Sequence, residues 1–295
     1  MFEAAQSLSQ ENQASASRIS RRFAELAERS ELGIVAYLTA GDPNLTASEE
    51  IVLAAAEAGA DVIELGVPFS DPMADGPIIQ RASERALRSG TTLAGVLALA
   101  RRLRAKTDVP LVLFSYYNPI LQAGLERFAS DAAAAGVDGV LVTDLTPEEA
   151  ADYRVAVRGH GIDTIFLGAP TSTDARLKLI AKATTGFLYL ISRTGVTGTR
   201  DALPEGLPAL ARRARAATKL PIAVGFGISL PTHVSVLGGI ADAAVVGSAL
   251  VAQVESATNS QAAVRGVGDL IRSLKGAARA GVSRRSDQTG SEQTP

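Results

Sequence analysis

The chain has 295 residues, and 29 Lys and Arg against 31 Asp and Glu give it a formal net charge of -2. This near balance supplies no basic surface for nucleic acid or for an anionic membrane. The absence of Cys excludes disulfides, thiolate metal sites and Cys nucleophiles, and the presence of only two His, at 160 and 233, argues against a zinc cluster or a Ser-His-Asp triad. We therefore expect no metal site, and chemistry that runs on carboxylates and backbone dipoles.

The two ends of the chain differ in composition from the rest. Residues 1–17 contain neither Lys nor Arg and no continuous apolar stretch, so they lack the features of a signal or transit peptide. Residues 281–295 are polar and rich in turn-forming residues. We expect flexible tails at 1–17 and 276–295 around one catalytic domain at 18–275, in a soluble, cytoplasmic protein.

Between the tails, strand-like and helix-like segments alternate. The segment 18–30 has helical periodicity and predicts an extra amphipathic helix that covers the bottom of the domain. Eight short, β-rich apolar runs follow, each succeeded by a helix candidate, and the longest interval, between the second and third runs, holds a loop and two helical stretches. The runs are 34–39, 61–67, 110–115, 139–143, 164–168, 186–191, 221–225 and 242–247.

These runs are almost continuously apolar, which is typical of a parallel sheet covered on both faces. Eight units in residues 18–275 give about 32 residues per unit, close to the ~30 of one strand–helix unit. A doubly wound sheet typically has fewer strands and a glycine fingerprint after the first. The sequence therefore predicts an α/β fold, a single (β/α)8 TIM barrel, in which catalytic groups lie at the C-terminal ends of the strands.

Two carboxylates stand at such positions. Glu64 interrupts the second strand, where burial would raise its pKa and suit it to general acid catalysis; the alternative is a structural charge bonded to backbone or Tyr. Asp75 lies in the loop 68–77, where Asp-Gly-Pro is also the ordinary sequence of a turn before a helix. Asp71 and Asp42 are read as turn or cap residues. Asp144 ends the fourth strand and is either a catalytic-face residue or the residue that precedes a helix cap.

Glycine-rich turns follow the sixth, seventh and eighth strands, at 193–198, 225–229 and 247–248. Glycines let backbone N–H groups approach an anion, and the loops after the last two strands are the usual phosphate site of a TIM barrel. The alternative is that glycine is simply common after strands. The loop 192–201 is long and rich in small residues, so it is also a candidate lid.

The lysines provide an exclusion. The chain has five, at 106, 178, 182, 219 and 275, and each falls in a predicted helix or just before a strand. A Schiff-base aldolase needs a lysine at the C-terminal end of a strand. Cleavage of a carbon–carbon bond in this chain would therefore proceed by proton transfer.

Several of these segments closely resemble the tryptophan synthase alpha-subunit family. The most specific match is IELGVPFSDPMADGP at 63–77, followed by YLISRTGVTG at 189–198 and VGFGIS at 224–229. LTAGDP at 38–43, YYNPI at 116–120 and APTST at 169–173 match in the same order. The resemblance extends from about residue 18 to about residue 274.

The resemblance implies a lyase of tryptophan biosynthesis that splits indole-3-glycerol phosphate into indole and glyceraldehyde 3-phosphate. Glu64 matches the principal acid/base, which protonates the indole carbon bearing the side chain and helps remove the glycerol hydroxyl proton. Asp75 matches the residue that bonds the indole N–H. The other matched positions contact substrate: Tyr189 beside the carboxylates, Thr197 on the loop that orients Asp75, Gly198, Gly227, Gly247 and Ser248 around the phosphate, and Tyr37, Phe114 and Phe226 along the indole pocket.

The same resemblance implies a protein partner, the pyridoxal-phosphate β-subunit, in an α2β2 heterotetramer contacted through 68–71 and neighbouring loops. The cofactor then belongs to the partner, and none is expected in this chain. Two positions depart from the family pattern. Thr143 and Thr146 stand where proline is usual, which would alter the stiffness of the loop near Asp144, and Gly168 replaces a bulky apolar residue, which would loosen the barrel.

Three other functions compete with this one. A stand-alone indole-releasing lyase would keep the same residues. Only activation by added β-subunit separates it from an α-subunit that works with a β-partner. A catalytically silent homologue that regulates the β-subunit would not need the intact Glu64, Asp75 and Thr197. A sugar-phosphate isomerase on the same barrel would share the phosphate turns without needing the segment 63–77.

Overall fold

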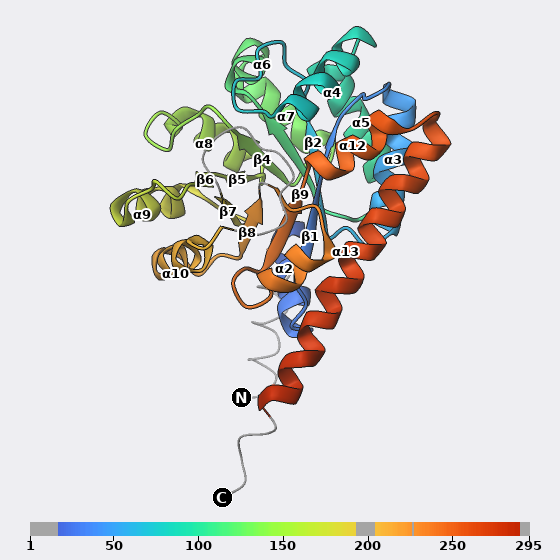
Figure 1. The fold of residues 1–295 in the computed structure, drawn as a ribbon. Helices are drawn as coiled ribbons and strands as arrows, with labels where there is room; N and C mark the ends of the chain where they lie inside the picture. Colours follow the sequence, from blue (N-terminus) through green and yellow to red (C-terminus); the bar gives the residue numbers. More distant parts are fainter. Residues whose placement is uncertain (1–16, 193–203, 226, 290–295) are drawn as a thin grey trace, which may run out of the picture.

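The structure is a computed structural model that describes residues 17–192, 204–225 and 227–289, with side-chain positions through residue 279. Its centre is a parallel sheet surrounded by helices (Figure 1). The strands are β1 (Gly33–Thr39), β2 (Val62–Gly66), β3 (Leu111–Ser115), β4 (Gly139–Val142), β5 (Asp163–Ile165), β6 (Leu167–Gly168), β7 (Leu188–Ile191), β8 (Ile222–Gly225) and β9 (Ala243–Val246).

The sheet closes on itself. Its strand order is β5-β4-β3-β2-β1-β9-β8-β7-β6, and each pairing between neighbours is parallel. β5 and β6 stand at opposite ends of this order, yet only Phe166 separates them in the chain. They are therefore two parts of the fifth predicted strand, and the eight predicted strands form a ring. The predicted (β/α)8 TIM barrel is confirmed.

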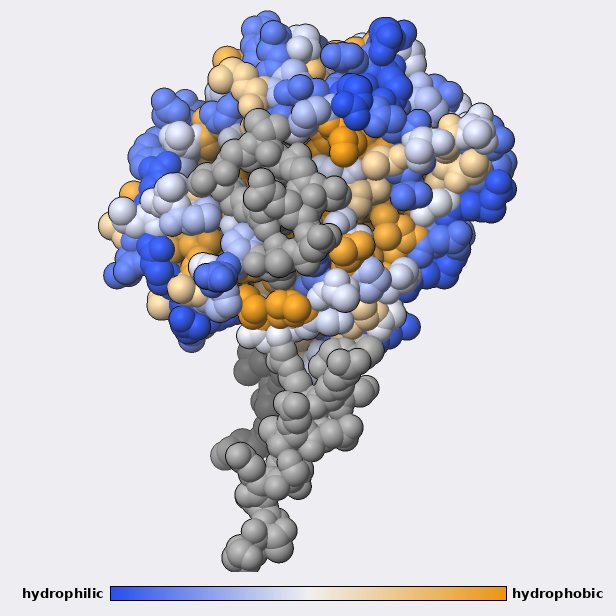
Figure 2. Space-filling model, viewed as in Figure 1, coloured by the Kyte–Doolittle hydropathy of each residue, from blue (hydrophilic) through white to orange (hydrophobic). Residues whose placement is uncertain are grey.

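Apart from the first, the helices lie around the outside of this ring (Figure 1). The interval between β2 and β3 contains two of them, as predicted, and hydrophilic residues dominate the outer edge of the face in Figure 2. The helices are α2 (Arg18–Glu28), α3 (Leu45–Glu57), α4 (Pro77–Arg88), α5 (Leu93–Arg104), α6 (Tyr117–Ala123), α7 (Leu125–Ala134), α8 (Ala151–Gly159), α9 (Asp174–Ala183), α10 (Leu207–Ala217), α11 (Pro231–Leu237), α12 (Ser248–Ser256) and α13 (Ser260–Thr289).

Alternate strand residues belong to two apolar clusters. In β1, Ile34 and Ala36 pack with the helices in the larger cluster, whereas Val35 and Tyr37 belong to the cluster inside the barrel. Successive side chains of a strand point to opposite faces, so both faces of the sheet must be apolar. The strand register pairs Tyr37 with Glu64 of β2, and this places the carboxylate among the inward-facing residues.

Helix α2 covers the bottom of the barrel, as predicted from its amphipathic pattern. Ser17 caps its N-terminus by accepting a hydrogen bond from Ser20 N at 3.2 Å. The buried residues Ile19, Phe23 and Leu26 join the apolar cluster inside the barrel, and the Phe23 ring lies 5.6 Å from that of Phe187. The lower end of the barrel is therefore closed.

The last helix, α13, runs through residues 260–289 and so continues past residue 275, where a polar tail is expected from the sequence. Part of this continuation is anchored, because Ala278 is buried against the barrel. Lys275 is also buried, and its Nζ lies 2.7 Å from Asp61 Oδ2 and 3.3 Å from Glu31 Oε2. Alanine and arginine in 276–280 are good helix formers, which favours extension of the helix.

Gly168 leaves no gap in the barrel. A Cβ built at this position would lie 2.9 Å from Leu190 Cδ2 and 3.2 Å from Leu177 Cδ2. Both leucines are fully buried, so they occupy the space that a larger residue at 168 would fill. The expectation that Gly168 loosens the barrel is therefore wrong, because its neighbours pack against it.

Asp144 caps α6, from which α7 and β4 separate it in the chain. Its Oδ1 accepts a hydrogen bond at 2.7 Å from the backbone N–H of Tyr117, the first residue of α6. Thr143 donates its hydroxyl to Ser115 O, and Thr146 donates to Glu149 Oε2. This contact with an earlier helix is a role that the sequence does not predict for Asp144, and the two threonines add hydrogen bonds that proline could not make.

Candidate active site

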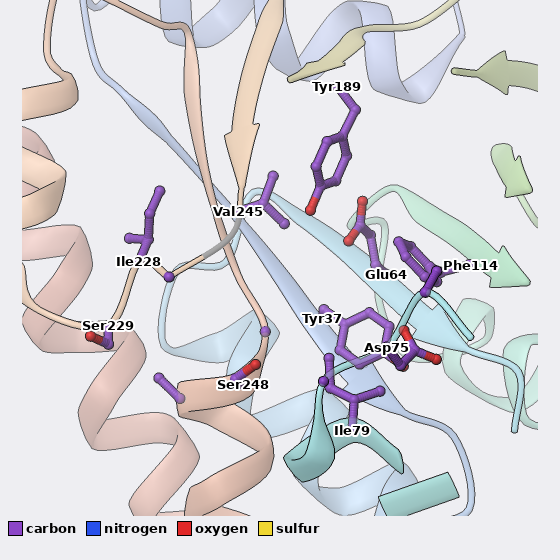
Figure 3. A pocket seen from close by; sticks show the side chains of 15 residues that line it. Tyr37, Glu64, Asp75, Ile79, Phe114, Tyr189, Ile228, Ser229, Val245 and Ser248 are labelled. Carbon is purple, nitrogen blue, oxygen red and sulfur yellow. The ribbon is translucent and has the colours of Figure 1, made fainter. Parts of the chain in front are cut away.

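A pocket opens at the C-terminal ends of the strands (Figure 3). Together with the open space at its mouth it measures about 620 Å³. Five side chains that line it come from five different strands: Tyr37 from β1, Glu64 from β2, Phe114 from β3, Tyr189 from β7 and Val245 from β9.

Glu64 is the most unusual group in this pocket. Its side chain is fully buried, and in the described part of the chain neither carboxyl oxygen has a hydrogen-bond partner. Burial raises its pKa from 4.5 to about 8, because the charged form has lost its water. The alternative of a structural charge bonded to neighbouring groups does not fit this environment, and the carboxyl group is protonated near neutral pH.

Two tyrosines flank Glu64. The Tyr189 hydroxyl points toward the Glu64 carboxyl group in Figure 3, and Tyr37 pairs with Glu64 in the register of β1 and β2. Burial, aided by nearby carboxylates, raises the pKa of both phenols well above the usual value. Both hydroxyls therefore stay protonated and add no negative charge beside Glu64.

Asp75 is held on the loop between β2 and α4. Its backbone N–H donates to Pro72 O at 3.1 Å, and its carbonyl accepts from Gln80 Nε2 at 3.0 Å. Pro77 then begins α4, a position where its missing N–H costs nothing. Burial raises the pKa of Asp75 from 3.8 to about 6, although a hydrogen bond from Tyr116 opposes this increase.

Tyr116 is a site residue that the sequence reading did not select. Its hydroxyl donates to Asp75 Oδ2 at 3.2 Å and accepts from Ala74 N at 2.9 Å. Its ring stacks on Phe69 with centroids 5.0 Å apart. The segment 116–120 was among the matched motifs, so the signal was present, but nothing in the spacing showed that this hydroxyl reaches Asp75.

The remaining wall of the pocket is apolar. The Tyr37 and Phe114 rings meet edge to face with centroids 5.1 Å apart. Ile79, in the first turn of α4, and Val245 also line the pocket, and both were missed in the sequence because apolar residues at such positions look like ordinary core. Such apolar and aromatic walls suit a flat, apolar ring system.

Opposite the carboxylates, backbone groups line the pocket. Gly227 has a φ of +93°, which few other residues adopt, and the segment 227–229 faces the same space as Gly247 and Ser248. Helix α12 begins at Ser248, and its cap residue Gly247 has no side chain to occupy the free N–H groups of the first turn. This end of the pocket suits an anion.

Two other glycines near the site make room for tyrosine side chains and do not face an anion. A Cβ on Gly225 would lie 2.2 Å from the Tyr189 hydroxyl oxygen, and one on Gly66 would lie 2.2 Å from that of Tyr37. Gly225 was read from the sequence as part of a phosphate turn. In the structure it makes room for the tyrosine that faces Glu64.

Several predicted site features lie outside the described residues. They are Thr197, Gly198, Phe226 and all but Ser192 of the candidate lid loop 192–201. Asp42 forms a two-pronged ion pair with Arg85, with both contacts at 2.8 Å, and Asp71 accepts a hydrogen bond from Ser70 Oγ.

Two further observations concern the described ranges 17–192, 204–225 and 227–289. They contain no group of three His, Asp or Glu side chains arranged to hold a metal ion. Within these ranges, no helix combines the length and apolar character needed to span a membrane.

Comparisons with known proteins agree on one family. A sequence model of the family described as tryptophan synthase alpha chain matches residues 23–279. The tryptophan synthase alpha chain of Solibacter usitatus is 53% identical over 258 residues, which cover 88% of this chain and 97% of that protein. The protein of the same description from Geobacter sp. (strain M21) is 52% identical over 259 residues, with the same coverage.

Solved structures give the same result. A tryptophan synthase structure from Mycobacterium tuberculosis superposes with a TM-score of 0.83 and 36% identity, covering 90% of this chain and 99% of that one. Tryptophan synthase subunit alpha from Legionella pneumophila also has a TM-score of 0.83 and 36% identity, covering 89% and 98%.

Proposed function

The chain belongs to the tryptophan synthase alpha chain family, and we propose that it cleaves indole-3-glycerol phosphate into indole and glyceraldehyde 3-phosphate. The observation that carries the proposal is the pair Glu64 and Asp75, two buried carboxyl groups with raised pKa values in one pocket. The pocket has the three parts this substrate requires, namely an acid, an apolar slot and an anion-binding end.

Glu64 acts as both acid and base in this proposal. With a pKa of about 8 it is protonated at neutral pH, so it donates its proton to the indole carbon that bears the glycerol side chain. The resulting carboxylate then accepts the proton of the glycerol hydroxyl. The bond between the indole carbon and the glycerol carbon breaks, its electrons restore the aromatic indole, and the hydroxyl carbon becomes the aldehyde. Glu64 ends the cycle protonated.

Asp75 stabilises the positive charge that develops on the indole nitrogen. With a pKa of about 6 it is ionised at neutral pH, and it accepts a hydrogen bond from the indole N–H. The two carboxyl groups divide the roles because Glu64 is more deeply buried than Asp75, which keeps a hydrogen bond from Tyr116.

The phosphate occupies the opposite end of the pocket. Gly227, Gly247 and Ser248 offer backbone N–H groups, and the N-terminus of α12 adds the positive end of its dipole. Tyr37 and Phe114 enclose the indole ring. The roles of Thr197 in orienting Asp75, of Gly198 at the phosphate and of Phe226 at the indole rest on the family resemblance.

We also propose a tryptophan synthase β-subunit as partner, in an α2β2 assembly, with the pyridoxal phosphate held by that partner. Related solved structures carry the name tryptophan synthase, which supports such a complex. Met73 supports the location, because its apolar side chain is 92% exposed beside the loop 68–71. Addition of a related β-subunit should raise indole release several-fold, and Met73→Asp should weaken this activation.

Indole release by the purified chain tests the function. Glu64→Gln keeps the shape of the side chain but removes the transferable proton, so turnover should fall about 10²–10⁴-fold. Glu57→Gln, on the exposed face of α3, is the matched control and should leave turnover unchanged. Unchanged turnover in Glu64→Gln would refute the acid/base role, and no indole release by the wild type, alone or with β-subunit, would refute the function.

A further inference from the structure

His233 lies behind the phosphate end of the pocket, and the mechanism above does not use it. It belongs to the first turn of α11, and its side chain is 3% exposed. Its Nδ1 accepts a hydrogen bond at 3.3 Å from the backbone N–H of Ser229. The imidazole therefore folds back onto the segment 227–229, which lines the pocket.

This hydrogen bond assigns the roles of the two ring nitrogens. Because Nδ1 accepts, the ring proton is on Nε2. Nε2 is buried, and among the described residues it has no hydrogen-bond partner. A buried N–H without a partner lowers stability. If position 233 served packing alone, an apolar side chain there would be more stable than His. The contact of Nδ1 with Ser229 is the compensating interaction that the structure shows.

The contact bears on the shape of the phosphate loop. Gly227 turns the chain with a positive φ, and two residues later the Ser229 N–H is tied to α11 through His233. Helix α11 itself starts in a defined place, because Pro231 opens it and the His233 N–H donates to Leu230 O at 3.0 Å. The Ser229 end of the segment 227–229 is therefore tied to α11.

We propose that His233 is a positioning residue that fixes the loop 227–229 for a phosphate group bound between this loop and Gly247–Ser248. The inference rests on the proposed function for the identity of the phosphate. His233 does not touch the phosphate, and its Nδ1 withdraws the Ser229 N–H from the ligand. The N–H groups of Gly227 and Ile228 then point in a constant direction.

Two variants separate this role from packing. His233→Asn places an acceptor oxygen close to the position of Nδ1, whereas His233→Leu fills similar space without an acceptor. The first measurement is the dissociation constant of inorganic phosphate for the purified chain, by calorimetry. The second is KM and kcat for release of indole from indole-3-glycerol phosphate.

His233→Leu should raise both the phosphate dissociation constant and KM about tenfold, the effect of one hydrogen bond, with kcat changed less. His233→Asn should stay within about threefold of wild type, since it restores the acceptor. If the leucine variant does not fold, His233→Met serves instead, because its flexible side chain adapts to the cavity. Unchanged phosphate binding in the apolar variant, or equal weakening in His233→Asn, would overturn the proposal.

The same data separate failure of this inference from failure of the proposed function. If wild type binds phosphate in a manner that depends on His233 but releases no indole, the inference stands and the lyase function falls. If wild type releases indole while the phosphate dissociation constant is the same in the His233 variants, the lyase function stands and the inference falls. A wild type that binds no phosphate refutes the inference.

Discussion

The hydroxyl of Tyr116 donates a hydrogen bond to Asp75 Oδ2 at 3.2 Å and thereby connects the loop after β3 to the loop after β2. The same oxygen accepts from Ala74 N, so it holds both the carboxylate and the backbone beside it. This bond stabilises the ionised form of Asp75, which lowers its pKa against the larger effect of burial. Tyr116 thus contributes to keeping Asp75 charged at neutral pH.

Tyr116→Phe should therefore raise the pKa of Asp75 and shift the acidic limb of the rate profile to higher pH. At pH 6, indole release should fall about 2–10-fold, the range for loss of one hydrogen bond. Tyr117→Phe is the matched control. It removes a hydroxyl from the next residue of the same segment, whose ring packs against Tyr153. Equal profiles for wild type and Tyr116→Phe would contradict the role of the hydroxyl.

The pH dependence of kcat/KM should be bell-shaped. Asp75 must be ionised, which requires a pH above about 6, and Glu64 must be protonated, which requires a pH below about 8. The free chain should therefore be most active near pH 7. Residual activity of Asp75→Asn should lose the acidic limb and keep the alkaline one. A profile that is flat between pH 5 and 9 would exclude both assignments.

The glycine in β8 provides a packing test. Gly225→Ala would bring its Cβ to 2.2 Å from the Tyr189 hydroxyl oxygen and 2.7 Å from Cζ, so the ring must move away from its position beside Glu64. Stability should fall by about 1–3 kcal/mol, as for other overpacked cores, and indole release should fall with it. Gly206→Ala is the control, because a Cβ there meets nothing within 4 Å. Thermal unfolding that is the same in both variants would show that the barrel absorbs the clash.

Much of the fold could be predicted from the sequence because its signals are local. Runs such as 61–67 are apolar on both faces, and a lone carboxylate within one, Glu64, is conspicuous on chemical grounds. The fifth predicted strand, 164–168, is one apolar run in the sequence. In the structure it is divided at Phe166 into β5, which pairs with β4, and β6, which pairs with β7. Local pattern was enough for the ring of strands and for Glu64, whereas Asp75 has the same local signature as an ordinary turn residue.

What the sequence did not show are contacts between distant segments. Tyr116 and Asp75 are 41 residues apart, and their bond depends on the register of β2 and β3. Gly225 has the local sequence of an anion-binding turn. A glycine that makes room for Tyr189 of the neighbouring strand β7 cannot be distinguished from such a turn by sequence alone. Asp144 likewise caps a helix that precedes it in the chain. Each of these contacts is decided by how neighbouring strands and the loops that follow them pack together.

The raised pKa of Glu64 also makes a prediction about stability. The folded chain holds this proton up to a pH of about 8, whereas an unfolded Glu releases it near 4.5. Between these values the folded state binds more protons than the unfolded state, so the contribution of Glu64 to stability falls as pH rises. It is most favourable below pH 4.5 and is lost by pH 8.

Glu64→Gln removes this dependence, since the amide does not titrate. The variant should match wild type most closely near pH 5 and exceed it progressively, by about 3 kcal/mol near pH 7, in the free energy of unfolding. Urea unfolding at pH 5, 6, 7 and 8 measures the difference, with Glu57→Gln as the exposed control that should show none. A gap that is constant across this range would mean that Glu64 is ionised in the folded chain at every pH tested. That result would remove the basis for its role as the acid, whereas a growing gap would show that this active site gives up stability for catalysis.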